Sequence, residues 1–153
     1  MLYIFYLMIV LCLAGIDQFS KFLITANFEL GQVKTVIAGF FDITYVRNYG
    51  AGFSILQNET SFLYMVSFLA IGSLTYLLLT SKKSEKLYRF CYLLIISGSL
   101  GNFIDRIRFR YVVDFLDFVI FHYDFPVFNI ADCYITVGCF LLILAIFREN
   151  KHA

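Results

Sequence analysis

Residues 128–147 read FNIADCYITVGCFLLILAIF, and Asp132 is the one charged residue among them. A helix that crosses the hydrocarbon core of a bilayer needs about 20 mostly apolar residues. The stretch therefore predicts a membrane span with a carboxylate close to its beginning. A charged side chain at the centre of a bilayer costs roughly 2.5–3.5 kcal/mol on insertion scales, so an acid retained in such a span indicates a function.

Three further stretches have the length and composition of membrane spans. Hydrophobic residues make up 61% of the chain and charged residues 15%, whereas soluble domains average about 45–50% and about 25%. With the first stretch, the predicted spans are residues 2–26, 61–80, 87–104 and 128–147. No basic region precedes the first span, so we expect it to be retained and not removed as a signal peptide. The chain is expected to be one domain, residues 1–153, of the all-α membrane class with four transmembrane helices.

The two longer connections, residues 27–60 and 105–127, are expected on the same side of the membrane. Within the first, residues 40–48 are rich in β-branched and aromatic side chains and are flanked by glycines. This composition predicts a small extracytoplasmic β element. A short outer-face helix or loop is expected to complete these segments, and Pro126 fits a turn before the fourth span.

Basic residues in short connections favour the cytoplasmic side of a membrane. The connection between the second and third spans holds four basic residues against one acid: Lys82, Lys83, Lys86, Arg89 and Glu85. We therefore expect this connection and both termini on the cytoplasmic side, and residues 27–60 and 105–127 on the outer side. Three arginines in the second outer segment oppose this orientation, but four aspartates in the same segment can offset them by pairing.

Charge and cysteine spacing narrow the classes of function. The net charge of +1 comes without a dense basic face, so no nucleic-acid partner is expected. The four cysteines, Cys12, Cys91, Cys133 and Cys139, lack Cys-x-x-Cys spacing and neighbouring histidines. They predict neither a disulfide framework nor a zinc site. We expect no metal and no cofactor.

Polar residues gather at the outer ends of the first and third spans. Asp17 and Lys21 are four residues apart, in the order that favours an ion pair on a helix. Asn102, Asp105 and Arg106 lie three and four residues apart, so they share one face of the third helix. Each group is compatible with a structural ion pair, since buried charges are usually paired. The alternative is that the group braces a functional site.

The beginning of the fourth span carries a comparable pair. Asn129 and Asp132 lie three residues apart in the first turn, where a carboxylate gains from the helix dipole. Either residue alone is compatible with a helix cap, but capping does not explain Asp114, which stands between Val113 and Phe115. Because helix bundles build their sites from facing helices, we expect these polar groups to converge in one pocket below the outer surface.

Elimination leaves carboxylate chemistry as the most natural function of these polar residues. The histidines, His122 and His152, lie in a loop and in the tail, so a Ser-His-Asp or Cys-His arrangement lacks a well-placed base. Neither a His-Glu-x-x-His zinc motif nor a P-loop motif occurs in the sequence. Two carboxylates held close, such as Asp114 and Asp132, share one proton: the ionised member can activate water while the protonated member polarises a carbonyl.

Five short motifs follow one another along nearly the whole chain. They are Asp17-Gln18-Phe19-Ser20-Lys21, Arg47-Asn48-Tyr49-Gly50-Ala51-Gly52-Phe53, Gly101-Asn102-Phe103-Ile104-Asp105-Arg106, Val112-Val113-Asp114-Phe115 and Phe128-Asn129-Ile130-Ala131-Asp132. Together they resemble the motifs of the lipoprotein signal peptidases, also called signal peptidase II. One such motif would be weak support, but five in the correct order on a four-span chain are specific.

The resemblance implies an aspartic endopeptidase of the bacterial cytoplasmic membrane, which removes the signal peptide from diacylglyceryl-modified prolipoproteins just before the lipidated cysteine. It implies that Asp114 and Asp132 are catalytic. Roles in substrate binding or support are implied for Asn48, Gly50, Asn102, Asp105, Arg106, Asn129, Ala131, Asp17 and Lys21. The expected partners are lipid-modified prolipoproteins and membrane lipids, with no obligate protein partner, and globomycin is the expected inhibitor.

The departures from the family's pattern are modest. Gly52 takes the usual small position in the second motif, and residues 97–99 replace a run richer in glycine and alanine. Gly98 and Gly101 remain, and small residues at this spacing let helices approach closely. Arg110 stands where the family commonly has glycine, four residues before the aspartate of the fourth motif. An arginine there is expected to affect the loop or its lipid contacts.

Two other classes of function are compatible with intramembrane acids. A small proton-coupled transporter or channel subunit would carry polar residues through the full membrane depth. Here they cluster at one end, and residues 61–80 offer no strong polar ligand. A non-catalytic assembly or chaperone protein would use its acids as structural pairs, which explains neither Asp114 nor the five motifs.

Overall fold

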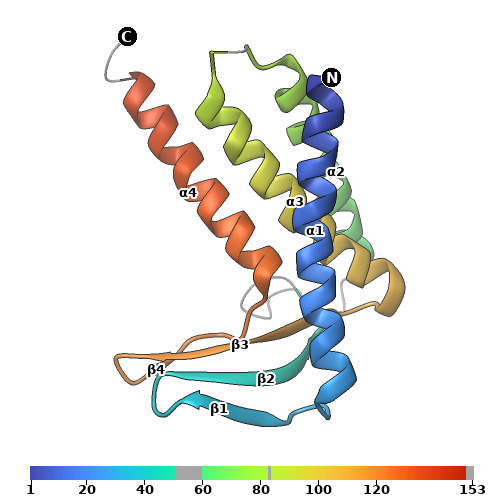
Figure 1. Cartoon of the computed structure of the whole chain (residues 1–153), viewed down its shortest axis with the longest axis vertical. Helices are drawn as coiled ribbons and strands as arrows, with labels where there is room; N and C mark the ends of the chain where they lie inside the picture. Colours follow the sequence, from blue (N-terminus) through green and yellow to red (C-terminus); the bar gives the residue numbers. More distant parts are fainter. Residues whose placement is uncertain (51–59, 83, 151–153) are drawn as a thin grey trace.

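A computed structural model describes residues 1–50, 60–82 and 84–150, and it contains four long helices with a small sheet at one end (Figure 1). The helices are α1 (Leu2–Asn27), α2 (Thr60–Thr80), α3 (Lys86–Phe109) and α4 (Ile130–Asn150). The beginning of α1 and the end of α4 lie at the end of the helices that faces away from the sheet (Figure 1). The predicted fold class, an all-α membrane protein with four transmembrane helices and a small β element, is confirmed.

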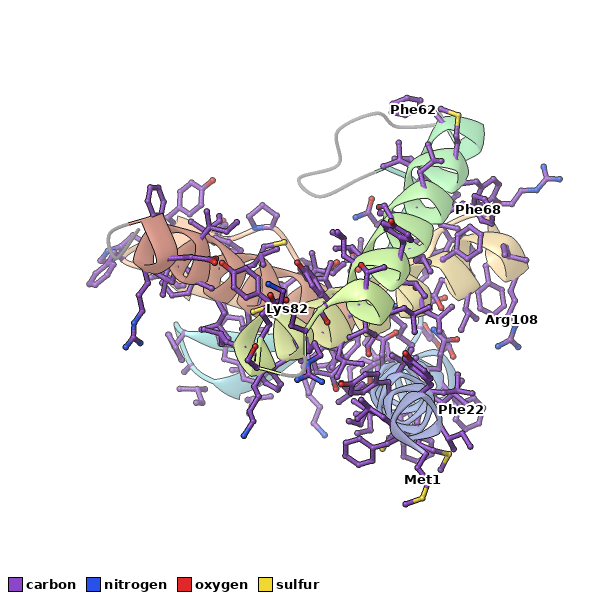
Figure 2. The ribbon with its side chains drawn as sticks, turned by 90° about the horizontal axis from the view of Figure 1, so that it is seen from above. Met1, Phe22, Phe62, Phe68, Lys82 and Arg108 are labelled. Atoms are coloured by element: carbon purple, nitrogen blue, oxygen red, sulfur yellow. The ribbon has the colours of Figure 1, made fainter. Side chains whose placement is uncertain are left out.

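The surface of the helices is suited to lipid. All four helices are long and apolar enough to cross a membrane. Large apolar side chains point outward, and Phe22, Phe62 and Phe68 are 62%, 45% and 66% exposed (Figure 2). Extended apolar surfaces of this kind mark membrane contact.

The third helix is the centre of the bundle. In the apolar stretch of α3, 50% of the residues are buried, compared with 22% in α1, 11% in α2 and 17% in α4. Tyr6 and Val10 from α1 pack with Leu78 from α2 and with Leu93 and Ile96 from α3. α3 contacts each of the other three helices, so residues on its outer turns can reach groups on α1 and α4 together.

The sheet covers the end of the bundle where these outer turns lie (Figure 1). Its antiparallel strands β1 (Val33–Ile37), β2 (Phe41–Asn48), β3 (Val112–Ile120) and β4 (Tyr123–Asp124) follow the chain in that order. Tyr45 on β2, and Val113 and Phe115 on β3, pack with Ile24 near the end of α1. This apolar cluster fixes the sheet to the helices.

Two local features differ from the predicted boundaries. α3 ends at Phe109 instead of residue 104, because Arg106 and Arg108 stand in its last turn, where cations interact favourably with the helix dipole. The strand predicted at residues 40–48 is β2, but β3 was not predicted. The first four residues of β3 are all buried, so this segment lacks the alternation of apolar and polar residues that reveals a half-buried strand.

Candidate active site

Asp114 reaches the site from β3. In the antiparallel register of β2 and β3, Val46 stands opposite Asp114, and Asn48, two residues further along β2, therefore shares its face. The Asn48 side-chain Nδ2 donates to Asp114 Oδ2 (2.8 Å). Asp114 is only 2% exposed, so the sheet places a carboxylate in a buried position and supplies one of its hydrogen-bond donors.

Asp132 reaches the site from the first turn of α4. The backbone N–H of Asn129 donates to Asp132 Oδ2 (3.1 Å), and the backbone N–H of Asp132 donates to Asn129 Oδ1 (3.0 Å). This reciprocal pair is the geometry of a helix capping box. Asn102 on α3 adds a third contact, from its Nδ2 to Asp132 Oδ1 (2.7 Å).

Asn129 joins the two aspartates. The same side chain that accepts from the Asp132 backbone donates through Nδ2 to Asp114 Oδ1 (2.6 Å). Asn129 is fully buried. The Asn129 side chain therefore caps the beginning of α4 and joins the two aspartates at the same time.

The surroundings of Asp114 favour its protonated form. Burial, and next the negative charge of Asp132, raise the pKa of Asp114 to about 7, against the opposing hydrogen bonds from Asn48 and Asn129. Desolvation and a neighbouring like charge both penalise a second carboxylate charge. At neutral pH the pair therefore retains a proton to donate, as acid–base chemistry requires.

A buried lysine connects α1 with α3 beneath this pair. Lys21 Nζ lies 2.9 Å from Asp17 Oδ2 and 3.0 Å from Asp105 Oδ2, and it donates to Asn102 Oδ1 at 2.9 Å. An ammonium group has three N–H donors, and these three oxygens match that number. The Asp17–Lys21 ion pair predicted from the sequence is present, and it is extended by Asp105.

The two acids of this cluster also hold the backbone beside each aspartate of the pair. Asp17 Oδ1 accepts from the Ala131 N–H (2.9 Å), one residue before Asp132. Asp105 Oδ2 accepts from the Val113 N–H (3.1 Å), one residue before Asp114. The cluster is thus a buried ion-pair network that also holds the backbone next to Asp114 and next to Asp132.

Arg106 and Gly50 extend the site toward β2. Arg106 Nη2 donates to the Gly50 carbonyl (3.1 Å), and the Gly50 N–H donates to Asn48 Oδ1 (2.9 Å). A chain of hydrogen bonds therefore leads from Arg106 through Gly50 and Asn48 to Asp114. The remaining residues of this motif, at positions 51–53, lie outside the described residues.

Gln18 was not singled out from the sequence, although it lies inside the first motif. Its Nε2 donates to Asp105 Oδ1 (2.7 Å) and to the Gly101 carbonyl (3.1 Å). Its position next to Asp17 could have indicated that Gln18 belongs to the site. Helical spacing alone, however, does not identify its hydrogen-bond partners on α3. Among residues 1–50, 60–82 and 84–150, no three His, Cys, Asp or Glu side chains converge to hold a metal ion.

Together, the fold and the site define a multi-span membrane protein in which two carboxylates, joined by one asparagine, lie where the helices meet the sheet. The sequence pattern of a known family, described as Signal peptidase (SPase) II, matches residues 9–148. This chain therefore belongs to the signal peptidase II family, as the five motifs predicted, and it is a protease.

Individual relatives agree over almost the full length. The lipoprotein signal peptidases of Streptococcus pyogenes serotype M5 (strain Manfredo) and serotype M3 (strain SSI-1) are each 44% identical over 142 residues, 92% of this chain and 91% of theirs. Two bacterial membrane enzymes solved by the in meso method have the same fold. One has a TM-score of 0.91 and 34% identity, over 96% of this chain and 90% of its own. The other has a TM-score of 0.83 and 35% identity, over 92% and 91%.

Proposed function

We propose that this protein is an intramembrane aspartic endopeptidase that removes the signal peptide from lipid-modified prolipoproteins, cleaving before the lipidated cysteine. Relatives that match over 92% of the chain are lipoprotein signal peptidases. The observation that carries the catalytic assignment is the junction of Asp114 and Asp132 through Asn129. This junction holds two acids in one site, where they act as a unit.

Asp132 is the general base and Asp114 the general acid in this proposal. Asp132 takes a proton from water as the water oxygen bonds to the scissile carbonyl carbon, and Asp114 gives its proton to the carbonyl oxygen. The resulting gem-diol collapses: the C–N bond breaks, the leaving amine receives the proton held by Asp132, and Asp114 recovers one from a diol hydroxyl. The assignment follows the deeper burial and raised pKa of Asp114.

The asparagines and the basic residues around the pair have supporting roles. Asn48, Asn102 and Asn129 orient the carboxylates through the contacts described above. Arg106 and Gly50 brace Asn48 and line the side of the site that faces the sheet. Lys21 holds Asp17 and Asp105, and these two carboxylates fix the backbone at Ala131 and Val113, next to the acid pair. The chemistry needs water and these side chains, with no cofactor or obligate protein partner.

The active site is proposed to lie near the extracytoplasmic face, with both termini in the cytoplasm. Lys82, Lys86 and Arg89 belong to the end of the bundle away from the sheet, and basic connections favour the cytoplasmic side. A signal peptide enters the membrane with its N-terminus inside and its cleavage site near the outer surface. The pair would meet the cleavage site at that depth, and the substrate's acyl chains could remain in the bilayer.

Cleavage of a lipid-modified precursor, followed as a mobility shift on a gel, tests the proposal. Asp114→Asn and Asp132→Asn are each expected to abolish processing while the protein still inserts into the membrane. Asp124→Asn, at an exposed position on β4, removes the same charge outside the site and should process normally. Globomycin should inhibit the wild type. Normal cleavage by either active-site variant would refute the mechanism.

A further inference from the structure

The hairpin that joins β3 to β4 ends in a strained turn. Ile120 pairs with Tyr123 across it, so Phe121 and His122 form a two-residue loop. Both loop residues have positive φ angles, 50° and 65°, which is the pattern of a type I′ turn. Such turns strongly favour Asn-Gly, and a positive φ is a genuine outlier for a bulky residue such as phenylalanine. Residues held in strained conformations cluster at functional positions, so this turn requires an explanation.

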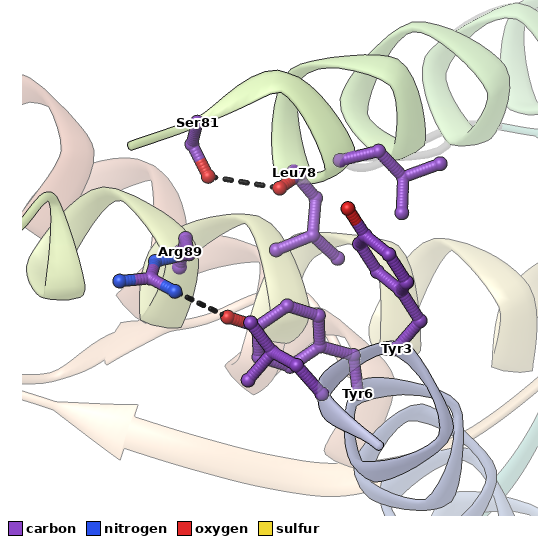
Figure 3. A pocket seen from close by; sticks show the side chains of 7 residues that line it. Tyr3, Tyr6, Leu78, Ser81 and Arg89 are labelled. Atoms are coloured by element: carbon purple, nitrogen blue, oxygen red, sulfur yellow. Dashed lines mark hydrogen bonds between the residues drawn. The ribbon is translucent and has the colours of Figure 1, made fainter. Parts of the chain in front are cut away.

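The turn displays its apolar side chains instead of packing them. Phe121 is 96% exposed, and Tyr123 and Ile120 beside it are 61% and 41% exposed. The cavity at the opposite end of the helices shows the contrast: Tyr6 in its wall is 8% exposed and accepts a hydrogen bond from Arg89 Nη1 (Figure 3). The hairpin tip therefore presents to its surroundings the kind of side chain that the bundle elsewhere packs inside.

The position of the hairpin indicates what these surroundings are. All four helices are long and apolar enough to cross a membrane, and the sheet lies across one end of them (Figure 1). The β3–β4 hairpin extends sideways past the beginning of α4, so in a membrane it lies over the lipid beside that helix (Figure 1). Residues 118–123 include no aspartate, glutamate, lysine or arginine, so no ionised carboxylate or basic side chain opposes contact with lipid.

We propose that the tip of the β3–β4 hairpin, residues 120–123, inserts into the interfacial layer of the adjoining lipid leaflet, with Phe121 as the side chain that enters it. Tyrosine is enriched at membrane–water interfaces, where its amphipathic ring sits at the level of the headgroups, and Tyr123 stands next to the turn. Transfer of the Phe121 ring out of water is favourable and offsets the strain of the turn. The inserted tip would hold β3, which carries Asp114, at a fixed height above the bilayer. The proposal does not depend on the peptidase mechanism.

Tryptophan fluorescence of the full chain in phospholipid vesicles tests this contact, because the sequence contains no tryptophan. Phe121→Trp therefore places a single reporter at the tip. Its emission should be blue-shifted and quenched by phospholipids that carry bromine on the upper part of an acyl chain, while aqueous acrylamide should quench it little. Lys34→Trp is the matched control at an exposed position on β1, which lies further from the helices than β3 (Figure 1). It should show the opposite pattern.

A second set of variants tests the Phe121 side chain itself, with the reporter at a neighbouring position. Tyr123→Trp should also be quenched by the brominated lipids. Addition of Phe121→Asn and His122→Gly supplies the pair that a type I′ turn favours. The midpoint of thermal unfolding in micelles should then rise, because the strain is relieved, whereas quenching by the brominated lipids should fall severalfold. Opposite changes in stability and in lipid contact separate this role from a purely structural one.

Four results would overturn the proposal. Strong acrylamide quenching of Phe121→Trp without quenching by brominated lipid would place the tip in water. Blue-shifted emission that brominated lipid does not quench, and that disappears on dilution into excess lipid, would assign the tip to a second copy of the chain. Emission that shifts only after a lipid-modified precursor is added would assign it to the substrate. Unchanged lipid quenching in the Phe121→Asn, His122→Gly variant would show that Phe121 is not the inserting side chain.

Discussion

Asn129 determines the relation between the two aspartates at the scale of single residues. Its Nδ2 donates to Asp114, while its Oδ1 and its backbone N–H are used by Asp132. An amide offers both a donor and an acceptor, so one side chain can serve a partly protonated pair without adding charge. An aspartate here would add a third negative charge, and an alanine would leave buried acceptors without a partner.

The pH dependence of cleavage should report the shared proton. Burial and the charge of Asp132 raise the pKa of Asp114 to about 7, so the pair loses its proton as the pH rises through this value. We expect kcat/KM for a lipid-modified precursor to fall on the alkaline side of neutrality. In Asn48→Ala, the loss of a hydrogen bond that favours the carboxylate should move this fall to higher pH.

A control and a stability measurement sharpen this prediction. Asn27→Ala, at an exposed position at the end of α1, should leave the profile unchanged. A rate that stays constant from about pH 6 to about pH 9 would contradict the assignment. Between the usual value of 3.8 and about 7, folded Asp114 holds a proton that the unfolded chain has released. Its contribution to the free energy of unfolding should therefore decrease as the pH rises through that window.

At the scale of elements, the end of α3 explains the unusual Arg110. This residue has φ 66°, in the left-handed region, and its N–H donates to the Arg106 carbonyl (2.9 Å). A helix commonly ends on such a residue, and glycine adopts the conformation without the steric cost of a Cβ atom. Glycine would fit this position without strain, whereas Arg110 carries the steric cost of its Cβ atom.

Arg110→Gly should stabilise the protein. Relief of the left-handed conformation is worth about 1 kcal/mol, which would raise the midpoint of thermal unfolding in detergent micelles. Arg108→Gly removes an equal charge two residues earlier, at an exposed position inside the helix. It should instead destabilise by up to about 1 kcal/mol, because glycine is a poor helix former. The same sign of change in both variants would contradict this explanation.

The contact between α3 and α4 should be sensitive to a single methyl group. A Cβ atom at Gly98 would collide with the carbonyl oxygen of Ala131, and a backbone atom cannot move away cheaply. Gly98→Ala should displace the first turn of α4, which carries Asp132, and lower kcat by roughly tenfold or more. Gly72→Ala on α2 meets no atom within 4 Å, so it should leave kcat unchanged. Equal activities would show that α4 can shift without affecting the acid pair.

The elements also show what sequence patterns can and cannot reveal. The strand at residues 40–48 was predictable because a short run of β-branched and aromatic residues flanked by glycines is typical of a strand between turns. β3 was not predictable, because Val112 and Val113 are buried on successive positions. A short apolar run of this kind does not distinguish a buried strand from a continuation of a helix.

At the scale of the whole molecule, three helix ends and the sheet meet around one buried lysine. Helical spacing predicted which polar residues share a face, and the placement of those faces at one end of the spans predicted their convergence. The bonds from Ala131 to Asp17 and from Val113 to Asp105 were not predictable. The first joins residues 114 positions apart, and the second connects the end of α3 with β3 across a turn, so no helical or strand periodicity records either bond.

Removal of the Lys21 charge should test how far the fold depends on this junction. Lys21→Met keeps a long apolar stem but leaves Asp17 and Asp105 buried, at 0% and 1% exposure, without their cation. Breaking a buried ion pair on one side costs about 3–5 kcal/mol, so the midpoint of unfolding in micelles should fall steeply. Lys34→Met, at an exposed position on β1, should change it little.

Because Asp17 and Asp105 also hold Ala131 and Val113, activity should be lost at temperatures where Lys21→Met is still folded. A variant that loses stability and activity in strict parallel would show that Lys21 supports the fold alone.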